Sequence, residues 1–457
     1  MIGRRLAHRR QGPSSPRTHH TMLRRFIVWL SDWLLGRPSD SVGPVALPEP
    51  GPPCVEPPAR PPRSRDVPPD PRTAMLRIIT AFDSAHPVRQ RKDLHGRDDK
   101  LELLFEAVLF NRQHAIIHGA RGSGKTSLAQ VFGDYADQRS AVVIYAACEA
   151  SASFADLLRP YFAFLPDSCV PFSEKANFER NREALSGAFG PREVVDFLSR
   201  LSPERQVIMI FDEFDRVQNS DVDQQVATLM KLLSDAQVPV QLLIVGIAHT
   251  LDDLINCHPS LRRHLMSIPI GRISQRDVIE LIDSGAARAR IEFDEAVKTQ
   301  IVTLACGSPY HAQLFCYVAA IEATKAGADT VDLAILRKGL ERACEAWGML
   351  NQDDHDRFLA LATSNAADTA RAELAAREAA GKDSLCPDAA TAELLGDALV
   401  PSGSADRYVF RDSTAPQFLL AMMALERALA NTKADDARDG SDPDDGDLPS
   451  LPLSIAV

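Results

Sequence analysis

The chain has 457 residues, 45% hydrophobic and 25% charged, which is the composition of a globular protein with room for two or three domains. Its net charge of −11 argues against a protein that coats nucleic acid with its whole surface. The eight cysteines are irregularly spaced and form no C-x-x-C pair, which argues against a zinc site or a disulfide framework and predicts an intracellular, cytoplasmic protein.

Residues 1–37 are basic and contain one amphipathic segment. Met22–Leu35 reads MLRRFIVWLSDWLL, with Arg24 and Arg25 on a polar face at helical spacing and apolar side chains over the rest. The segment is too short to span a bilayer. Such a helix lies in a membrane interface as a peripheral contact, docks on a partner, or packs on the protein's own body, and the pattern leaves these alternatives open. Residues 1–21 are expected to be disordered, which leaves Met22 as an alternative start.

Residues 38–72 form a proline-rich linker with thirteen prolines. Proline lacks a backbone donor and favours extended polyproline conformations, so the stretch has neither the hydrogen bonds nor the apolar residues of a core. The composition predicts a semi-rigid spacer. The alternative is a ligand for a proline-recognition domain.

Residues 73–273 alternate apolar runs of strand length with amphipathic helices, such as 98–110, 125–135 and 223–233. The expected strands are 115–118, 141–146, 207–211, 240–247 and 266–270. This alternation is typical of an α/β domain with a mostly parallel, doubly wound sheet flanked by helices.

The pattern changes after the last of these strands. Residues 274–347 are purely helical, and residues 348–430 are mainly helical with two short apolar segments around a Pro-Ser-Gly-Ser turn. Helices followed by a β-hairpin predict a winged-helix-like domain. Residues 431–457 are rich in aspartate and are expected to form an acidic, disordered tail.

The strongest chemical signal is a phosphate-binding loop at Gly119–Thr126, which fits G-x-x-x-x-G-K-[ST] at every fixed position. The loop follows an apolar strand and opens a helix, and this context argues against a chance glycine-rich turn. Backbone N–H groups and the helix N-terminus attract phosphate, Lys125 neutralises the β- and γ-phosphates, and Thr126 offers a hydroxyl to Mg²⁺. The nucleotide-binding residues predicted here are Gly119, Ala120, Arg121, Gly122, Ser123, Gly124, Lys125, Thr126 and Ser127.

A second signal is the pair of acids that ends the apolar run Val207–Phe211. Asp212 is predicted to hold Mg²⁺, and Glu213 to polarise the water that attacks the γ-phosphate. The alternative is two solvated acids in a loop. A third, weaker signal follows the next apolar strand, where His249 or Thr250 is a candidate to sense the γ-phosphate, or is an ordinary loop residue.

Together these residues resemble the AAA+ ATPases, in the branch that contains replication initiators of the origin-recognition type and related archaeal-type ATPases. The resemblance covers about residues 90–345, from Leu94-His-Gly-Arg-Asp98 to Gly307-Ser-Pro309. It implies that Gly96 and Arg97 lie in the segment that cradles the adenine. It also implies that 274–347 is a helical lid and that 348–430 is a winged helix, which either binds DNA or makes protein contacts.

The chain departs from the family in two places. His249 stands where the family usually has asparagine, and Tyr310 and His311 stand where the lid often carries a sensing arginine. The Gly-x-Pro turn of the lid also resembles the signalling STAND-type ATPases, which act as switches. These departures imply that hydrolysis is slow or that the lid senses nucleotide in another way.

Family members commonly supply an arginine finger from a neighbouring subunit, and Arg262 and Arg263 lie in a comparable place. If either acts in this way, the active form is a homo-oligomer. The alternative is a solvated or salt-bridging arginine pair.

The expected function is that of an ATPase using ATP and Mg²⁺, which couples nucleotide state to assembly or remodelling of a DNA or protein partner. DNA is the weaker of these partners, because the C-terminal region carries no dense lysine or arginine stripe. The alternative is a nucleotide switch with slow hydrolysis, tethered to a membrane or a partner through Met22–Leu35.

Overall fold

The computed structural model describes residues 71–439, except for 218, 247–258, 383 and 403–405. The predicted helix Met22–Leu35, the linker up to residue 70, the end of the acidic tail and the candidates His249 and Thr250 lie outside the described residues. No helix among the described residues is long and apolar enough to cross a membrane.

Five parallel strands form the central sheet in the order β2-β3-β4-β1-β5. They are β1 His114–His118, β2 Val142–Ala147, β3 Val207–Asp212, β4 Val240–Gly246 and β5 Leu265–Pro269. The described strands agree with the predicted ones to within one residue at each end, which confirms the expected α/β class. Strands buried on both faces consist of continuous apolar runs, so their limits are visible in the sequence.

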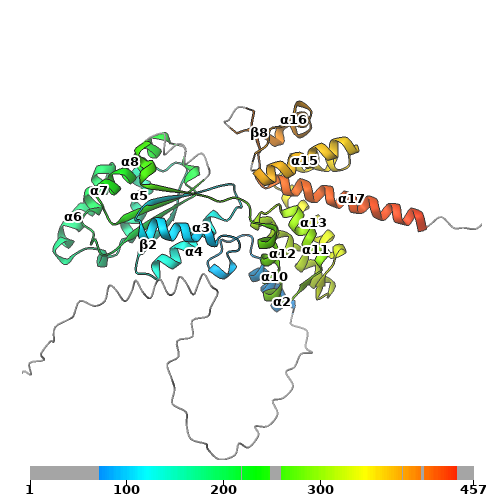
Figure 1. The fold of residues 1–457 in the computed structure, drawn as a ribbon, viewed down its shortest axis with the longest axis horizontal. Helices are drawn as coiled ribbons and strands as arrows, with labels where there is room; N and C mark the ends of the chain where they lie inside the picture. Colours follow the sequence, from blue (N-terminus) through cyan, green and yellow to red (C-terminus); the bar gives the residue numbers. More distant parts are fainter. Residues whose placement is uncertain (1–70, 218, 247–258, 383, 403–405, 440–457) are drawn as a thin grey trace, which may run out of the picture. The chain divides into compact units, whose positions relative to one another are not determined.

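Helices cover both faces of the sheet (Figure 1). On one face, Ile117 and Ile210 pack with residues of α3 and α4. On the other, Ile116 and Met209 pack with residues of α5, α7 and α8. Successive strand side chains alternate between the faces, so each strand contributes to both cores. The helices of this region are α3 Asp98–Leu104, α4 Lys125–Asp137, α5 Phe154–Phe164, α6 Lys175–Ala184, α7 Pro191–Leu198 and α8 Ser220–Asp235.

A buried histidine ties three elements of this region together. His114 Nδ1 accepts from the N–H of Leu242 at 2.9 Å, and Nε2 lies 2.8 Å from the carbonyl oxygen of Met230. These partners require a neutral ring with its proton on Nε2. Burial lowers the pKa of His114 to about 4, although the carbonyl of Met230 opposes the shift.

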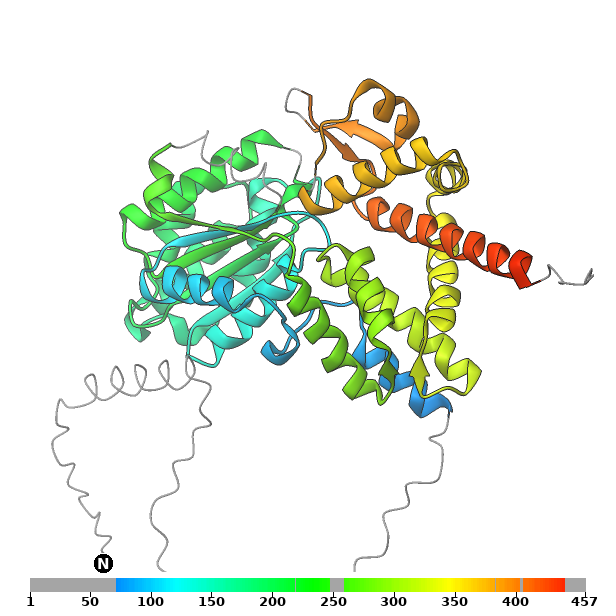
Figure 2. The same cartoon turned by 45° about the vertical axis from the view of Figure 1, so that its right-hand side comes forward.

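The remaining helices share one further hydrophobic core. They are α10 Gln275–Ala289, α11 Glu295–Ala305, α12 Pro309–Ala326, α13 Leu333–Gly348, α14 Gln352–Ala362, α15 Ala366–Lys382, α16 Ala389–Leu395 and α17 Ala415–Asp439. The N-terminal helix α2, Pro71–Ala81, also belongs to it, and Figures 1 and 2 both show α2 beside α10 and α12. The pair β6 Glu292–Phe293 and β7 Thr330–Val331 lies in the same region.

An antiparallel hairpin of β8 Leu399–Pro401 and β9 Tyr408–Phe410 follows α16, where the sequence predicted one. Before it, Trp347 stacks on Phe358 and Phe418, and its indole N–H donates to Asp412 at 2.7 Å. These contacts join the end of α13 to the start of α17. The winged-helix assignment of residues 348–430 stays a prediction, as do the other domain boundaries.

Candidate functional site

The phosphate-binding loop connects β1 to α4. Three of its glycines have positive φ, and two of them show why glycine is required. Gly124 has φ +92° directly before α4, and Gly119 has φ +154°, with an added Cβ placed 2.2 Å from the carbonyl oxygen of Ile270. An L side chain is strained at the first position and collides with backbone at the second. The loop can therefore curl with its N–H groups turned inward, as phosphate binding requires.

Two polar groups of this loop are available to phosphate. Lys125 Nζ donates to the carbonyl oxygens of Gly119 and Ala120 at 3.0 and 2.8 Å, so the cation already lies over the loop. Ser123 is buried, and its hydroxyl has no hydrogen-bond partner among the described residues. A buried hydroxyl without a partner is costly, and a phosphate oxygen would satisfy it. The loop therefore fits a nucleotide phosphate.

Arg97 stabilises the phosphate-binding loop through hydrogen bonds to backbone carbonyls. Its guanidinium is buried and donates to the carbonyl oxygens of Ser123, at 3.0 Å, and Gly271, at 2.5 Å. Burial lowers the pKa of Arg97, while Asp99 and Asp277 oppose the shift. The resemblance placed Arg97 in the segment that cradles the adenine, and in the structure Arg97 lines the cavity. Its hydrogen bonds connect the phosphate-binding loop to the residues between β5 and α10. The neighbouring Gly96 has φ +65° and approaches Asp277 at the start of α10.

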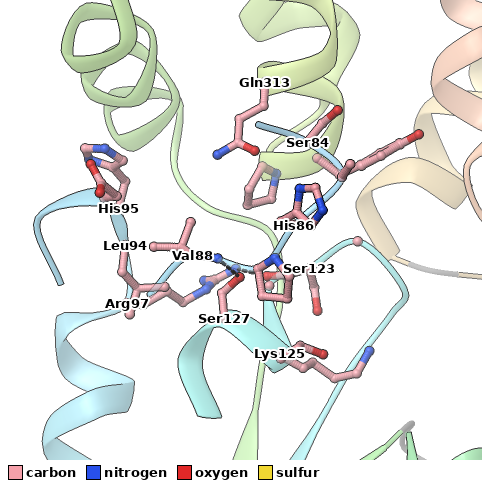
Figure 3. Close-up of a pocket in the computed structure, with 18 of the residues that line it drawn as sticks. Ser84, His86, Val88, Leu94, His95, Arg97, Ser123, Lys125, Ser127 and Gln313 are labelled. Atoms are coloured by element: carbon pink, nitrogen blue, oxygen red, sulfur yellow. Dashed lines mark hydrogen bonds between the residues drawn. The ribbon is translucent and has the colours of Figure 1, made fainter. Parts of the chain in front are cut away.

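A cavity of about 320 Å³ adjoins the loop, within the range of small-molecule sites. Its walls come from the segment before α3, the phosphate-binding loop, Asp212 and Glu213 at the end of β3, and residues of α10 and α12. Gln313 points from α12 toward the cavity, and the N–H of Val88 donates to Ser127 Oγ at 3.0 Å (Figure 3). Leu94, Leu281 and Pro309 supply apolar surface. The cavity therefore combines an apolar part with a phosphate end.

Asp212 lies at that phosphate end. Its Oδ1 accepts from Thr126 Oγ at 3.3 Å and from the N–H of Glu213 at 2.9 Å, and its Oδ2 accepts from the Tyr145 hydroxyl. A carboxylate and a hydroxyl side by side are the oxygen ligands that Mg²⁺ prefers. Asp212 and Thr126 are therefore the residues that would hold this ion. Burial and the nearby Asp212 raise the pKa of Cys148 to about 12.

Glu213 is oriented by its backbone and by an arginine. It has φ +54°, uncommon for a residue with a side chain, and its Oε2 accepts from Arg216 at 2.8 Å. About half of each side chain is exposed. In this arrangement the candidate base is paired with a cation, although Glu213 also lines the cavity. Arg121 lies further out, with Oδ2 of Asp215 at 3.9 Å.

The remaining candidates lie apart from the cavity, line it, or are buried beside it. Arg262 and Arg263 are exposed in the 3₁₀ helix Pro259–Arg263 and do not line the cavity. Tyr310 does line it. His311 is buried behind Tyr310, 2.9 Å from Ser308 Oγ, and burial lowers its pKa to about 3. A neutral, buried His311 lacks the charge with which an arginine would sense phosphate.

The side chains that the sequence did not single out include Tyr145, which hydrogen-bonds to Asp212, and Gln313, which lines the cavity. Tyr145 interrupts the apolar run of β2 with a polar tip, and Gln313 lies one helical turn after Pro309. The first was a visible signal, because a hydroxyl near the carboxyl end of a parallel strand faces the binding edge of the sheet. The second depends on how α12 approaches the loop.

The fold and this site define a P-loop nucleotide-binding protein. Residues 93–245 match the family described as AAA ATPase domain. This segment contains the phosphate-binding loop and the acids Asp212 and Glu213 at the end of β3, so the resemblance to AAA+ P-loop ATPases is confirmed. No curated protein matches the chain.

Three solved structures illustrate what this chain is similar to. Cdc6p from Pyrobaculum aerophilum is 14% identical, with 77% of this chain and 98% of that chain covered and a TM-score of 0.42. The Aeropyrum pernix ORC2 protein is 15% identical, with 78% and 98% covered and a TM-score of 0.43. A Walker-type ATPase of Pyrococcus abyssi is 16% identical, with 74% and 99% covered and a TM-score of 0.44. Likenesses this distant do not bear on activity.

Proposed function

We propose that the chain binds ATP in the cavity beside Gly119–Thr126 and hydrolyses it, using the nucleotide state to assemble with or remodel a DNA or protein partner. The observation that carries the proposal is the meeting of three groups at one end of the cavity: the Lys125 ammonium, the Thr126 hydroxyl and the Asp212 carboxylate. A cation, a hydroxyl and a carboxylate at a helix N-terminus suit a triphosphate with its metal.

Each residue of the site has a separate role in the proposed reaction. Lys125 and the loop N–H groups bind and orient the phosphates. Thr126 and Asp212 supply the oxygen atoms that would hold the metal. Bound Mg²⁺ neutralises charge on the phosphate oxygens. Glu213, at the same end, orients the attacking water and accepts its proton. Arg262 and Arg263, exposed on one chain, would act on the site of a neighbouring copy in a homo-oligomer.

A second candidate is a nucleotide switch with slow hydrolysis. The 2.8 Å pair between Glu213 and Arg216 favours it, because the carboxylate oxygen that would accept the proton of water already accepts a hydrogen bond from the guanidinium. Tyr310 and the neutral His311 carry no charge at the positions where an arginine would sense phosphate, and this also favours the switch. On this alternative, ATP binding drives assembly, hydrolysis only resets it, and Met22–Leu35 tethers the chain to a partner or a membrane.

The ATPase rate against protein concentration, with and without double-stranded DNA, separates the two candidates. A rate per subunit that rises with concentration supports an assembling enzyme with a shared arginine, and a further rise with DNA supports a DNA partner. Tight ATP binding with negligible turnover supports the switch. Glu213→Gln serves as the blank for contaminating ATPases. A chain that binds no ATP would contradict both candidates.

A further inference from the structure

Tyr145 and Asp212 come from neighbouring parallel strands. Tyr145 pairs with Ile210 in the register of β2 and β3, and Asp212 lies two residues beyond Ile210. Because strand side chains alternate, Tyr145 and Asp212 lie on the same face of the sheet. The Tyr145 hydroxyl donates its hydrogen bond to Asp212 Oδ2. The contact therefore follows from the strand register.

Both oxygens of the Asp212 carboxylate are held. Oδ1 accepts from Thr126 Oγ and from the N–H of Glu213, and Oδ2 accepts from Tyr145. The last torsion of an aspartate is soft, so one oxygen held alone would leave the plane of the carboxylate free to turn. With Oδ2 held by Tyr145, Oδ1 stays beside the Thr126 hydroxyl.

The Tyr145 ring does little packing of its own. Its relative exposure is 36%, and it belongs to neither hydrophobic cluster on the faces of the sheet. The hydroxyl also interacts with the side chain of Gln130 on α4, and Gln130 and Tyr145 both line a separate surface hollow. A partly exposed ring that lies outside both cores, and whose hydroxyl contacts a buried carboxylate, acts mainly through that hydroxyl.

We propose that Tyr145 is a positioning residue for magnesium, which orients Asp212 so that Oδ1 and Thr126 Oγ face the ion together. This inference rests on the proposed ATP-binding function and adds a residue that contacts neither nucleotide nor metal. Groups that hydrogen-bond to a metal ligand fix its orientation, and their loss typically weakens metal affinity about 10–100-fold.

Tyr145→Phe in the full chain tests the proposal, because it removes the hydroxyl and keeps the ring. The measurement is binding of a fluorescent ATP analogue while Mg²⁺ is titrated, repeated with EDTA in place of the metal. The magnesium concentration at half-saturation should rise about tenfold or more. Binding in EDTA should stay unchanged, because the phosphate-binding loop is intact.

Tyr161→Phe is the matched control. The Tyr161 side chain is buried, and its hydroxyl donates to the carbonyl oxygen of Ile210 at 2.6 Å. Ile210 lies on β3, the strand that also carries Asp212. This change should lower the melting temperature and leave the magnesium curve in place. A Tyr145→Phe curve equal to that of the parent, or an equal shift in both variants, would overturn the proposal. The parent protein is measured first. If its ATP binding does not depend on the magnesium concentration, both the proposal and the assignment of Thr126 and Asp212 as metal ligands are contradicted.

Discussion

Thr126 donates a hydrogen bond to Asp212 across 3.3 Å, and this contact joins the first turn of α4 to the end of β3. The two residues are far apart in the chain, and they meet because parallel strands present their carboxyl ends at one edge of the sheet. The contact brings the phosphate-binding loop and the acidic pair into one site. Four predictions test the site and the fold that supports it.

Lys125→Ala should weaken ATP binding about a hundredfold or more, because it removes the loop cation that compensates the phosphate charge. Isothermal titration with ATP measures the change. Lys231→Ala is the control, since Lys231 pairs with Asp235 on the surface of α8, away from the cavity. Unaltered ATP affinity in Lys125→Ala would contradict the proposed function.

Glu213→Gln should preserve ATP binding and reduce turnover about 10²–10⁴-fold, the usual contribution of a general base. The amide keeps the size of the side chain but cannot accept the proton from water. Steady-state phosphate release gives the rate, and titration gives the affinity. Glu179→Gln, in a surface pair with Arg182 on α6, should match the parent. Equal turnover in Glu213→Gln would mean that another group activates the water.

Arg216→Ala should raise turnover about two- to fivefold, because it frees Glu213 from its partner. The gain is small because both side chains are about half exposed, and such pairs contribute about 0.2–1 kcal/mol. ATP affinity should stay the same, and the gain should shrink in high salt. A fall in turnover would instead assign Arg216 a supporting part in hydrolysis.

Stability should fall as the pH is lowered from about 6.5 toward 4, because His114 is neutral when folded, with its pKa lowered to about 4 from the ordinary 6.5. Between these two pH values His114 is protonated in the unfolded chain but neutral in the folded chain, so lowering the pH favours unfolding. Each such histidine contributes a slope of roughly 1.4 kcal/mol per pH unit. His311, with a pKa of about 3, adds to the same trend.

Urea unfolding at several pH values measures that slope. His114→Gln should be less stable at neutral pH and should have a shallower dependence on pH. His86→Gln is the control, because His86 is exposed and its contact with Asp83 lies on the surface. A slope unaffected by His114→Gln would place the titration elsewhere.

The sequence by itself determined the local features: the glycine-rich loop, the strand before it, the helix after it, and the acids that end β3. These depend on residues close together in the chain, so spacing and apolar pattern report them directly. The α/β class follows for the same reason. The hairpin at Leu399–Phe410 was also visible, because a turn signal separates its two strands.

Only the tertiary structure decided which distant groups meet. Arg97 donates to carbonyls of Ser123 and Gly271, 26 and 174 residues away, and no local pattern encodes such partners. The register of β2 on β3 brings Tyr145 to Asp212, and the packing of α12 places Tyr310 at the cavity while burying His311. These outcomes depend on the order of the strands and the docking of the helices, which long-range packing of the whole chain determines.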